Sequence, residues 1–235
     1  MMALRTKLDI AANNVANLET TGFRAQQVSF QEYLAPVMGQ EVGAKRERPV
    51  SLVHAASAFT TSAAGAVRTT ENPLDFAIDG NAYFVIRTDQ GERYTRDGSF
   101  TLDETGRLVT MDGQPVLADN GVVMVPRKAG EITVDSSGQI STKQGTLGRL
   151  RLVSFSKQTS LQAEGGNLFR SNQPPDETKA ESVKILQGAV EHSNVQATFE
   201  MSRLAEINRS YEIASKLLKD TQTVDDLNKL ANVPE

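Results

Sequence analysis

The sequence predicts a mixed α and β fold, in which an all-β central domain of short antiparallel strands lies between two paired helices of the coiled-coil type. Three observations predict this class. Apolar residues recur every three or four positions near the start of the chain and again near its end, and glycines recur every seven to nine residues between them. With 235 residues, 39% of them hydrophobic, the chain is long enough for one large domain or two modest ones.

The first helix is expected within residues 1–22. It has a narrow apolar stripe at alternating spacings of four and three residues: Leu4, Leu8, Ala11, Val15 and Leu18. Gly22 suits the left-handed conformation that follows a helix, so the segment Thr20–Gly22 is expected to end it. A helix of about five turns is marginal alone in water, so this helix needs a partner.

The expected partner lies in the last segment, residues 186–235, with its helix over about Val195–Leu230, where there is no Gly or Pro. Ser193 and Asn194 are candidate N-caps. The apolar stripe again alternates spacings of three and four residues: Leu204, Ile207, Tyr211, Ala214 and Leu218. A helix of this length is typical of a coiled coil.

Between the helices we expect an irregular arm over residues 23–72 and a β domain over residues 73–185, with a return linker at 156–182. Several of the regularly spaced glycines follow Asp, Asn or Ser, as in Asp97-Gly98 and Asn120-Gly121. Such pairs are typical of tight turns between strands. The units between them are too short and dissimilar to predict a propeller or a solenoid.

The composition excludes several chemistries. The chain has no Cys and only two His, and its net charge is −4, so we expect no thiol chemistry, metal site, cofactor or nucleic-acid partner. It has no apolar run long enough to span a membrane, and no secretory signal peptide is visible at its start. Asp75, Asp79, Asp97 and Asp103 lie beside turn signals and are interpreted as turn residues. No catalytic residue is predicted, and we expect no enzyme.

Two other classes remain as alternatives. A carbohydrate-binding β domain would need an exposed aromatic platform, for which Tyr83, Phe84 and Tyr94 are the candidates. A hydrolase would need an acid and a base with shifted pKa values, and no residue spacing here predicts such a pair.

Four sequence blocks, taken together, resemble the flagellar rod and hook protein family. They are LDIAANNVANLETTGFR at 8–24, ENPLDFAIDG at 71–80, YTRDGSF at 94–100 followed by GRLV at 106–109, and QG at 187–188 followed by EHSNV at 191–195. The family-motif residues that we single out are Thr21, Gly22, Phe23, Asn72, Pro73, Leu74, Asp75, Gly80, Tyr94, Arg96, Gly98, Gly188, Ser193 and Asn194. Thr21–Phe23 is expected to end the helix and to act as a hinge.

The resemblance implies a structural subunit of the bacterial flagellar basal body. It implies export through the flagellar type III apparatus without signal cleavage, a rod that spans the periplasm and transmits torque from motor to hook, and partners that are other rod proteins and copies of the same chain. The short chain and the compact stretch between Phe23 and Asn72 favour a proximal-rod over a distal-rod or hook subunit.

The terminal stripes suggest how such a subunit assembles. Each is too narrow to be stable alone, so burial against its partner and against neighbouring subunits would couple folding to assembly. The residues expected in the inner helical layer are Leu8, Val15, Leu204, Tyr211 and Leu218. Ile207, in the same stripe, is expected at the subunit interface. Asn13, Asn14 and Asn17 have two interpretations: polar residues on the solvent side of a helix, or amides that hydrogen-bond between subunits and fix register.

Overall fold

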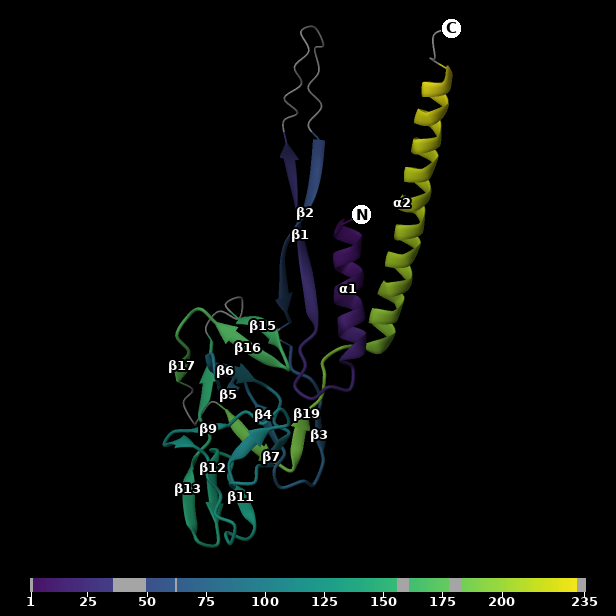
Figure 1. Cartoon of the computed structure of the whole chain (residues 1–235). Helices are drawn as coiled ribbons and strands as arrows, with labels where there is room; N and C mark the ends of the chain where they lie inside the picture. Colours follow the sequence, from purple (N-terminus) through teal and green to yellow (C-terminus); the bar gives the residue numbers. More distant parts are fainter. Residues whose placement is uncertain (1, 36–49, 62, 156–160, 178–182, 232–235) are drawn as a thin grey trace. The chain divides into compact units, whose positions relative to one another are not determined.

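A computed structural model describes residues 2–35, 50–61, 63–155, 161–177 and 183–231 (Figure 1). The chain divides into two compact units, which we describe separately. Unit 1 consists of residues 1–16, 26–59 and 196–235, and unit 2 of residues 17–25 and 60–195.

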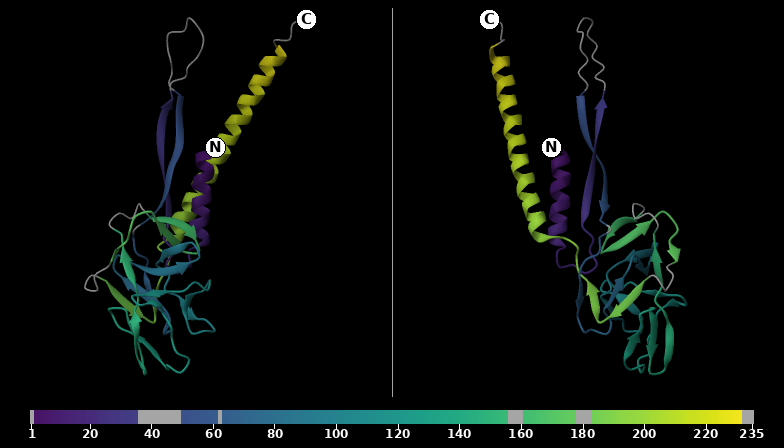
Figure 2. Two further views of the ribbon diagram at one scale, coloured as in Figure 1. Left: turned by 60° about the vertical axis from the view of Figure 1, so that its left-hand side comes forward. Right: turned by 180° about the vertical axis from the view of Figure 1, so that it is seen from behind.

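Unit 1 contains the two helices. They are α1 (Met2–Ala16) and α2 (Ala197–Ala231), of which α2 lies close to its predicted limits. The two helices are in contact, and the views in Figures 1 and 2 show that they run in opposite directions. Together with the antiparallel strands of unit 2, they confirm the mixed α and β class.

The prediction of an irregular arm over residues 23–72 is wrong for most of its described part. Strands β1 (Gln26–Ala35) and β2 (Val50–Thr60) form a two-stranded sheet in unit 1. In unit 2, β3 (Val67–Thr69) pairs with β19 (Ala189–Glu191). A strand this short is stabilised by a partner more than 100 residues away along the chain, which local composition does not reveal.

The β domain is in unit 2. Its remaining strands are β4 (Phe76–Asp79), β5 (Tyr83–Thr88), β6 (Gly91–Thr95), β7 (Phe100–Leu102), β8 (Leu108–Thr110), β9 (Leu117–Ala118), β10 (Gly121–Val122), β11 (Ile132–Val134), β12 (Gln139–Thr142), β13 (Gly145–Arg149), β14 (Leu152–Ser154), β15 (Leu161–Gly165), β16 (Leu168–Ser171), β17 (Asp176–Glu177) and β18 (Lys184–Gln187).

The largest sheet has the strand order β15-β16-β6-β5-β14-β17. Its strand β5 begins with a run of four buried apolar residues, Tyr83 to Ile86. Because side chains alternate between the two faces of a strand, Phe84 and Ile86 pack into one core cluster, and Tyr83 and Val85 pack into a second. The sheet is therefore covered on both faces along β5.

The prediction of a return linker over residues 156–182 is also wrong in its described part. β15 and β16 form a hairpin that adds two strands to the largest sheet, and β17 lies at its other edge. Leu161 and Phe169 are buried in the second core cluster. Gly165 ends β15, and Gly166 with Asn167 forms the turn of this hairpin, so the Gly165-Gly166 pair does not mark irregular chain.

Two hairpins of the β domain have the same loop. Asp103 Oδ1 accepts hydrogen bonds from the backbone N–H groups of Thr105 and Arg107, both at 2.9 Å. Asp135 Oδ1 does the same with Ser137 at 2.8 Å and Gln139 at 3.0 Å. The segments FTLDETGRLVT (100–110) and ITVDSSGQIST (132–142) thus form one structural unit that occurs twice.

Candidate assembly site

Among the described side chains of α2, five large apolar ones are exposed. They are Phe199 (62% exposed), Met201 (57%), Tyr211 (45%), Ile213 (62%) and Leu217 (62%). Phe199 and Leu217 lie about five turns apart and therefore on the same side of the helix, with Ile213 one turn before Leu217. We call these three residues the α2 apolar surface. Met201 and Tyr211 lie on other sides of the helix. Single exposed apolar residues are ordinary, whereas a series of them along one helix marks an interaction surface.

The lengths of the two helices explain part of this exposure. α1 has 15 residues and α2 has 35. Asn14, near the end of α1, donates a hydrogen bond to Glu200, near the start of α2. In an antiparallel pair with this register, Met2 lies beside the turn of α2 that carries Tyr211. Ile213 and Leu217 therefore lie beyond the described end of α1. Figure 2 shows that α2 continues well past the end of α1.

The apolar residues predicted at the subunit interface are buried, half-buried or exposed in the single chain. Ile207 is buried, at 5% exposed, and Leu8, Val15 and Leu204 are half-buried. Tyr211 is exposed. The side chain of Leu218 lies outside the described residues.

Sequence reasoning did not identify the most buried side of α1. Its buried residues are Ile10, Ala11 and Asn14, so the leucine and valine stripe lies at the flank of the contact. The predicted stripe included Ala11 but not Ile10 or Asn14, because it was counted from apolar residues at alternating spacings of four and three and so passed over a buried amide.

Asn13 and Asn14 of α1, and Asn17 directly after it, have different surroundings. Asn13 is exposed, and Asn17 Oδ1 accepts a hydrogen bond from the Thr20 hydroxyl at 3.1 Å. Asn14 is 0% exposed, and its side chain bonds to Gln26 and Glu200 of the same chain. The solvent-side interpretation is therefore wrong for Asn14. A role for these residues between subunits stays a prediction.

In unit 2, the segment that follows α1 is attached to the β domain. The N–H of Gly22 donates to the carbonyl of Glu191 at 2.7 Å, and the Thr21 hydroxyl donates to Asp97 Oδ1 at 2.7 Å. Gly22 has φ +67°, and a Cβ there would lie 2.3 Å from the backbone nitrogen of Asp97. α1 ends at Ala16, so the prediction that Thr21–Phe23 ends the helix is wrong, and a hinge at this point would have to break these contacts.

A buried ion cluster joins three family-motif blocks within unit 2. Glu191 is 2% exposed and lies between Arg24, whose Nη2 is 2.9 Å from Glu191 Oε1, and Arg96, whose Nε donates to Glu191 Oε2 at 2.7 Å. Burial lowers the pKa of Arg24, and the charge of Glu191 opposes this effect. One carboxylate thus fixes the segments that lead out of α1 and toward α2 onto the β domain.

Asn194 completes this attachment. Its Oδ1 accepts from the N–H of Ala25 at 2.7 Å, and its Nδ2 donates to the Thr61 hydroxyl at 2.8 Å and to the Ala63 carbonyl at 2.7 Å. Within the part of the chain that the structure describes, neither predicted N-cap residue hydrogen-bonds to α2, which begins at Ala197. Ser193 Oγ accepts a hydrogen bond from the N–H of Val195, and Asn194 binds the chain around it. We call Arg24, Arg96, Glu191 and Asn194 the anchor cluster.

The other family-motif residues shape the strands around the anchor cluster. Asn72 Nδ2 donates to Asp75 Oδ1 at 2.9 Å, which folds the turn through Pro73 and Leu74 into β4. The Gly188 N–H donates to the Asp75 carbonyl, and the Gly80 carbonyl accepts from Arg96 at 2.9 Å. Sequence reasoning missed Arg24 and Glu191 as an ion pair, because 167 residues of chain separate them.

The aromatic-platform alternative is wrong. Tyr83, Phe84 and Tyr94 are 5%, 0% and 6% exposed, because they lie on β5 and β6 inside the two core clusters. Burial raises the pKa of both tyrosines. These rings present no surface on which a sugar would stack.

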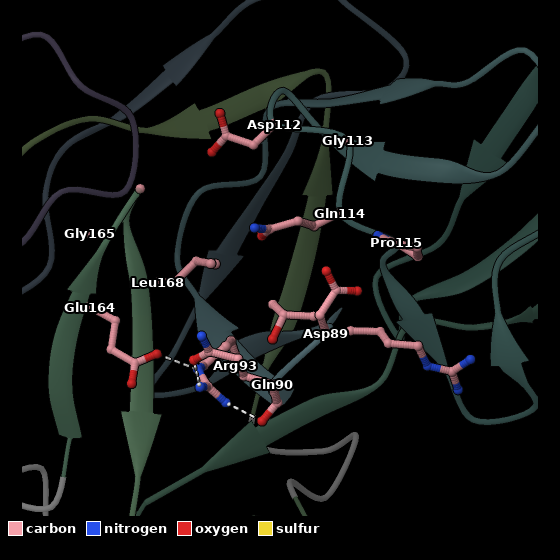
Figure 3. Close-up of a pocket in the computed structure, with 13 residues that line it drawn as sticks. Asp89, Gln90, Arg93, Asp112, Gly113, Gln114, Pro115, Glu164, Gly165 and Leu168 are labelled. Atoms are coloured by element: carbon pink, nitrogen blue, oxygen red, sulfur yellow. Dashed lines mark hydrogen bonds and ion pairs between the residues drawn. The ribbon is translucent and has the colours of Figure 1, made fainter.

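A polar pocket of about 620 Å³ opens beside β5, β6 and β16 (Figure 3). Arg93 lies along its wall, where its Nε donates to Glu164 Oε2 at 2.5 Å and its Nη2 to Gln90 Oε1 at 3.2 Å. Glu164 is thus held in an ion pair. Within the described ranges, no group of three His, Asp or Glu is arranged to hold a metal ion, and neither helix is long and apolar enough to cross a membrane.

Three protein-family models match the chain. "Flagella basal body rod protein" matches residues 1–24, "Flagellar hook protein FlgE/F/G D1 domain" matches residues 77–142, and "Flagellar basal body rod FlgEFG protein C-terminal" matches residues 186–230. The first and last of these contain α1 and most of α2.

Named relatives align over nearly the whole chain. The chain is 35% identical to the flagellar basal-body rod protein FlgF of Caulobacter vibrioides over 94% of this chain and 89% of the relative. Identity to FlgF of Rhizobium meliloti is 37% over the same shares. The flagellar basal-body rod protein FlgG of Bacillus subtilis is 31% identical, over 99% of this chain and 95% of the relative.

Proposed function

Because the chain belongs to the flagellar basal-body rod protein family, we propose that it builds the rod by burying its terminal helices against those of neighbouring subunits. The chain is a structural subunit of the rod and is FlgF-like. A FlgG-like, distal-rod role is the alternative, and the identity to that group gives it no better support.

The observation that carries this proposal is the α2 apolar surface. Ile213 and Leu217 are each 62% exposed in the single chain. Burying a large aliphatic side chain contributes about 1.5–3 kcal/mol, so a few such residues supply much of a stable contact. Neighbours in a helical rod meet through two different surfaces, so the surface that covers α2 need not be another α2.

The export route, location and partners that we propose are those that membership of the family implies. The subunit leaves the cytoplasm through the flagellar type III apparatus without signal cleavage, occupies the part of the rod that spans the periplasm, and transmits torque there. Its partners are other rod proteins and copies of itself. Paired helices of the coiled-coil type, in which side chains interlock along the seam, form the inner layer of this assembly.

The test is incorporation of a Leu217→Glu variant into basal bodies. A carboxylate on the α2 apolar surface would have to be buried without a partner, so we expect the variant to be absent from isolated basal bodies and the cells to lose motility. The measurement is an immunoblot of purified basal bodies against the wild type.

Ala205→Glu is the matched control. Ala205 is exposed on the side of α2 that carries Arg209 and Glu212, and a Glu there lies four residues before Arg209, a favourable spacing. We expect this variant to incorporate normally. The amount of each variant exported from the cell separates failed assembly from failed export. Incorporation of Leu217→Glu at the wild-type level would overturn the proposal.

A further inference from the structure

The buried carboxamide of Asn14 joins three segments of unit 1. Its Oδ1 accepts a hydrogen bond from the N–H of Gln26 at 2.8 Å, and its Nδ2 donates to the Gln26 carbonyl at 2.9 Å. The same Nδ2 donates to Glu200 Oε1 at 3.2 Å. One side chain therefore ties α1 to the start of β1 and to the first turn of α2.

The acceptor on α2 is itself held in place. Glu200 is 5% exposed, and its backbone N–H donates to the Gln196 carbonyl at 3.0 Å. Arg203 Nη1 lies 3.8 Å from Glu200 Oε1, at the i,i+3 spacing. A buried carboxylate beside an amide is costly unless its position is well defined, so the pair favours one arrangement of the two helices.

Apolar packing alone does not select that arrangement. Leu204 and Tyr211 lie seven residues apart on the same side of α2. A shift of α1 along α2 by seven residues would therefore replace one apolar residue by another and keep an apolar seam. The same shift would bring Ile207 opposite Asn14 in place of Glu200, and a buried donor would lose its acceptor.

We propose that Asn14 is the positioning residue that fixes the register of α1 against α2 of its own chain. This inference adds to the proposed function. It rests on that function only where it concerns assembly, because the register decides which residues of α2 are covered by α1 and which a neighbouring subunit can cover. With Asn14 opposite Glu200, Ile213 and Leu217 stay outside the pair.

The test uses pairs of cysteines, because the natural chain has none and the introduced thiols are then the only ones. Ala11→Cys with Leu204→Cys reports the register described here, and Ala11→Cys with Tyr211→Cys reports a shift of seven residues. Position 11 is buried, so the thiols are joined directly: purified full-length protein is oxidised with copper phenanthroline, and the yields of intramolecular and intermolecular disulfide cross-links are measured by mass spectrometry.

We expect the first pair to cross-link within the chain at least tenfold more than the second. Asn14→Leu, in which a side chain of similar size makes no hydrogen bond, is expected to lower this ratio at least tenfold and to give cross-linked dimers. Asn13→Leu, the same change at the exposed neighbouring residue, is expected to leave the ratio unchanged.

A pair of charge-conserving changes covers the case in which Asn14→Leu unfolds unit 1. Asn14→Asp places a second carboxylate beside Glu200 and is expected to lower the ratio. Adding Glu200→Gln removes the like charge and supplies an amide donor to the new carboxylate, and it is expected to restore part of the ratio, because the Gln26 carbonyl still lacks its donor. A merely structural loss of packing would not be rescued in this way.

Two results would overturn the proposal: an unchanged ratio in Asn14→Leu, or failure of Glu200→Gln to restore the ratio in Asn14→Asp. Both measurements are made on the purified subunit and need no rod. The role of the α2 apolar surface in assembly is therefore tested separately, by the incorporation of Leu217→Glu into basal bodies.

Discussion

Glu191 and Arg96 form a charged hydrogen bond of 2.7 Å inside unit 2, and each side chain is 2% exposed. The second oxygen of the same carboxylate lies 2.9 Å from Arg24 and accepts the N–H of Gly65 at the same distance. The carboxylate thus balances two buried guanidinium groups and holds three chain segments that are far apart in the sequence.

Replacing this carboxylate is expected to destabilise unit 2 strongly. In Glu191→Gln two buried arginines lose their shared counter-charge, and breaking a buried ion pair typically costs about 3–5 kcal/mol. The measurement is urea unfolding followed by tyrosine fluorescence, which reports the buried Tyr83 and Tyr94 in a chain without Trp.

Glu164→Gln is the control for this prediction. Glu164 pairs with Arg93 but is 31% exposed, and a partly exposed ion pair contributes about 1 kcal/mol or less. Equal losses of stability in Glu164→Gln and Glu191→Gln would contradict the importance that we assign to burial in the anchor cluster.

Gly22→Ala is expected to destabilise the chain by more than backbone strain alone. Gly22 has φ +67° and no room for a Cβ beside Asp97. Gly113 has φ +81°, and nothing lies within 4 Å of a Cβ built there. The loss of stability in Gly113→Ala therefore measures the cost of the left-handed conformation alone, which is about 1–2 kcal/mol. Thermal unfolding of both variants checks the prediction, and a smaller loss in Gly22→Ala than in Gly113→Ala would refute it.

The two like loops at Asp103 and Asp135 predict that the stability of the fold depends on pH. Hydrogen bonds from the Thr105 and Ser137 hydroxyls, with backbone N–H groups, hold the pKa values of Asp103 and Asp135 below their ordinary values. Their folded pKa values thus lie below the unfolded value of about 3.9. These carboxylates therefore stabilise the fold above that pH, and the contribution is lost as the pH falls below it.

The measurement for the loops is the melting temperature as a function of pH. We expect the Asp103→Asn, Asp135→Asn double variant to melt lower at neutral pH and to lose less stability than the wild type below about pH 4. Asp103→Asn should show the larger change of the two single variants, because Asp103 also accepts a hydrogen bond from Arg107 Nε at 2.6 Å, whereas the corresponding residue in the second loop is the neutral Gln139. Parallel pH curves for the double variant and the wild type would show that the loops do not titrate with folding.

The parts of the fold that depend on local sequence were predictable. Apolar spacing predicted the limits of α2 and the start of α1 to within about two residues. The end of α1 was placed too late, at Gly22 instead of Ala16, although Gly22 does have the left-handed conformation. The Asp-Gly and Asn-Gly turns lie between short strands as expected, because turn chemistry acts within four residues.

The parts that depend on distant partners were not predictable. β3 is stabilised by β19, and Arg24 meets Glu191, through contacts that no spacing along the chain records. The apolar run at Tyr83–Ile86 was open to an interpretation as an exposed platform, because burial on both faces depends on the neighbouring strands. Asn14 was one of three candidates for a register-fixing amide between subunits, and its partners within the chain, Gln26 and Glu200, were not predicted for the same reason.

The most direct test of the assembly account is trypsin accessibility of α2 in the free subunit and in isolated basal bodies. Arg209, Lys216 and Lys219 are exposed on α2 around the α2 apolar surface. We expect cleavage after these residues in the purified subunit and protection of all three in basal bodies, where neighbouring helices cover α2. Equal cleavage in both states would contradict the claim that α2 is buried when the rod forms.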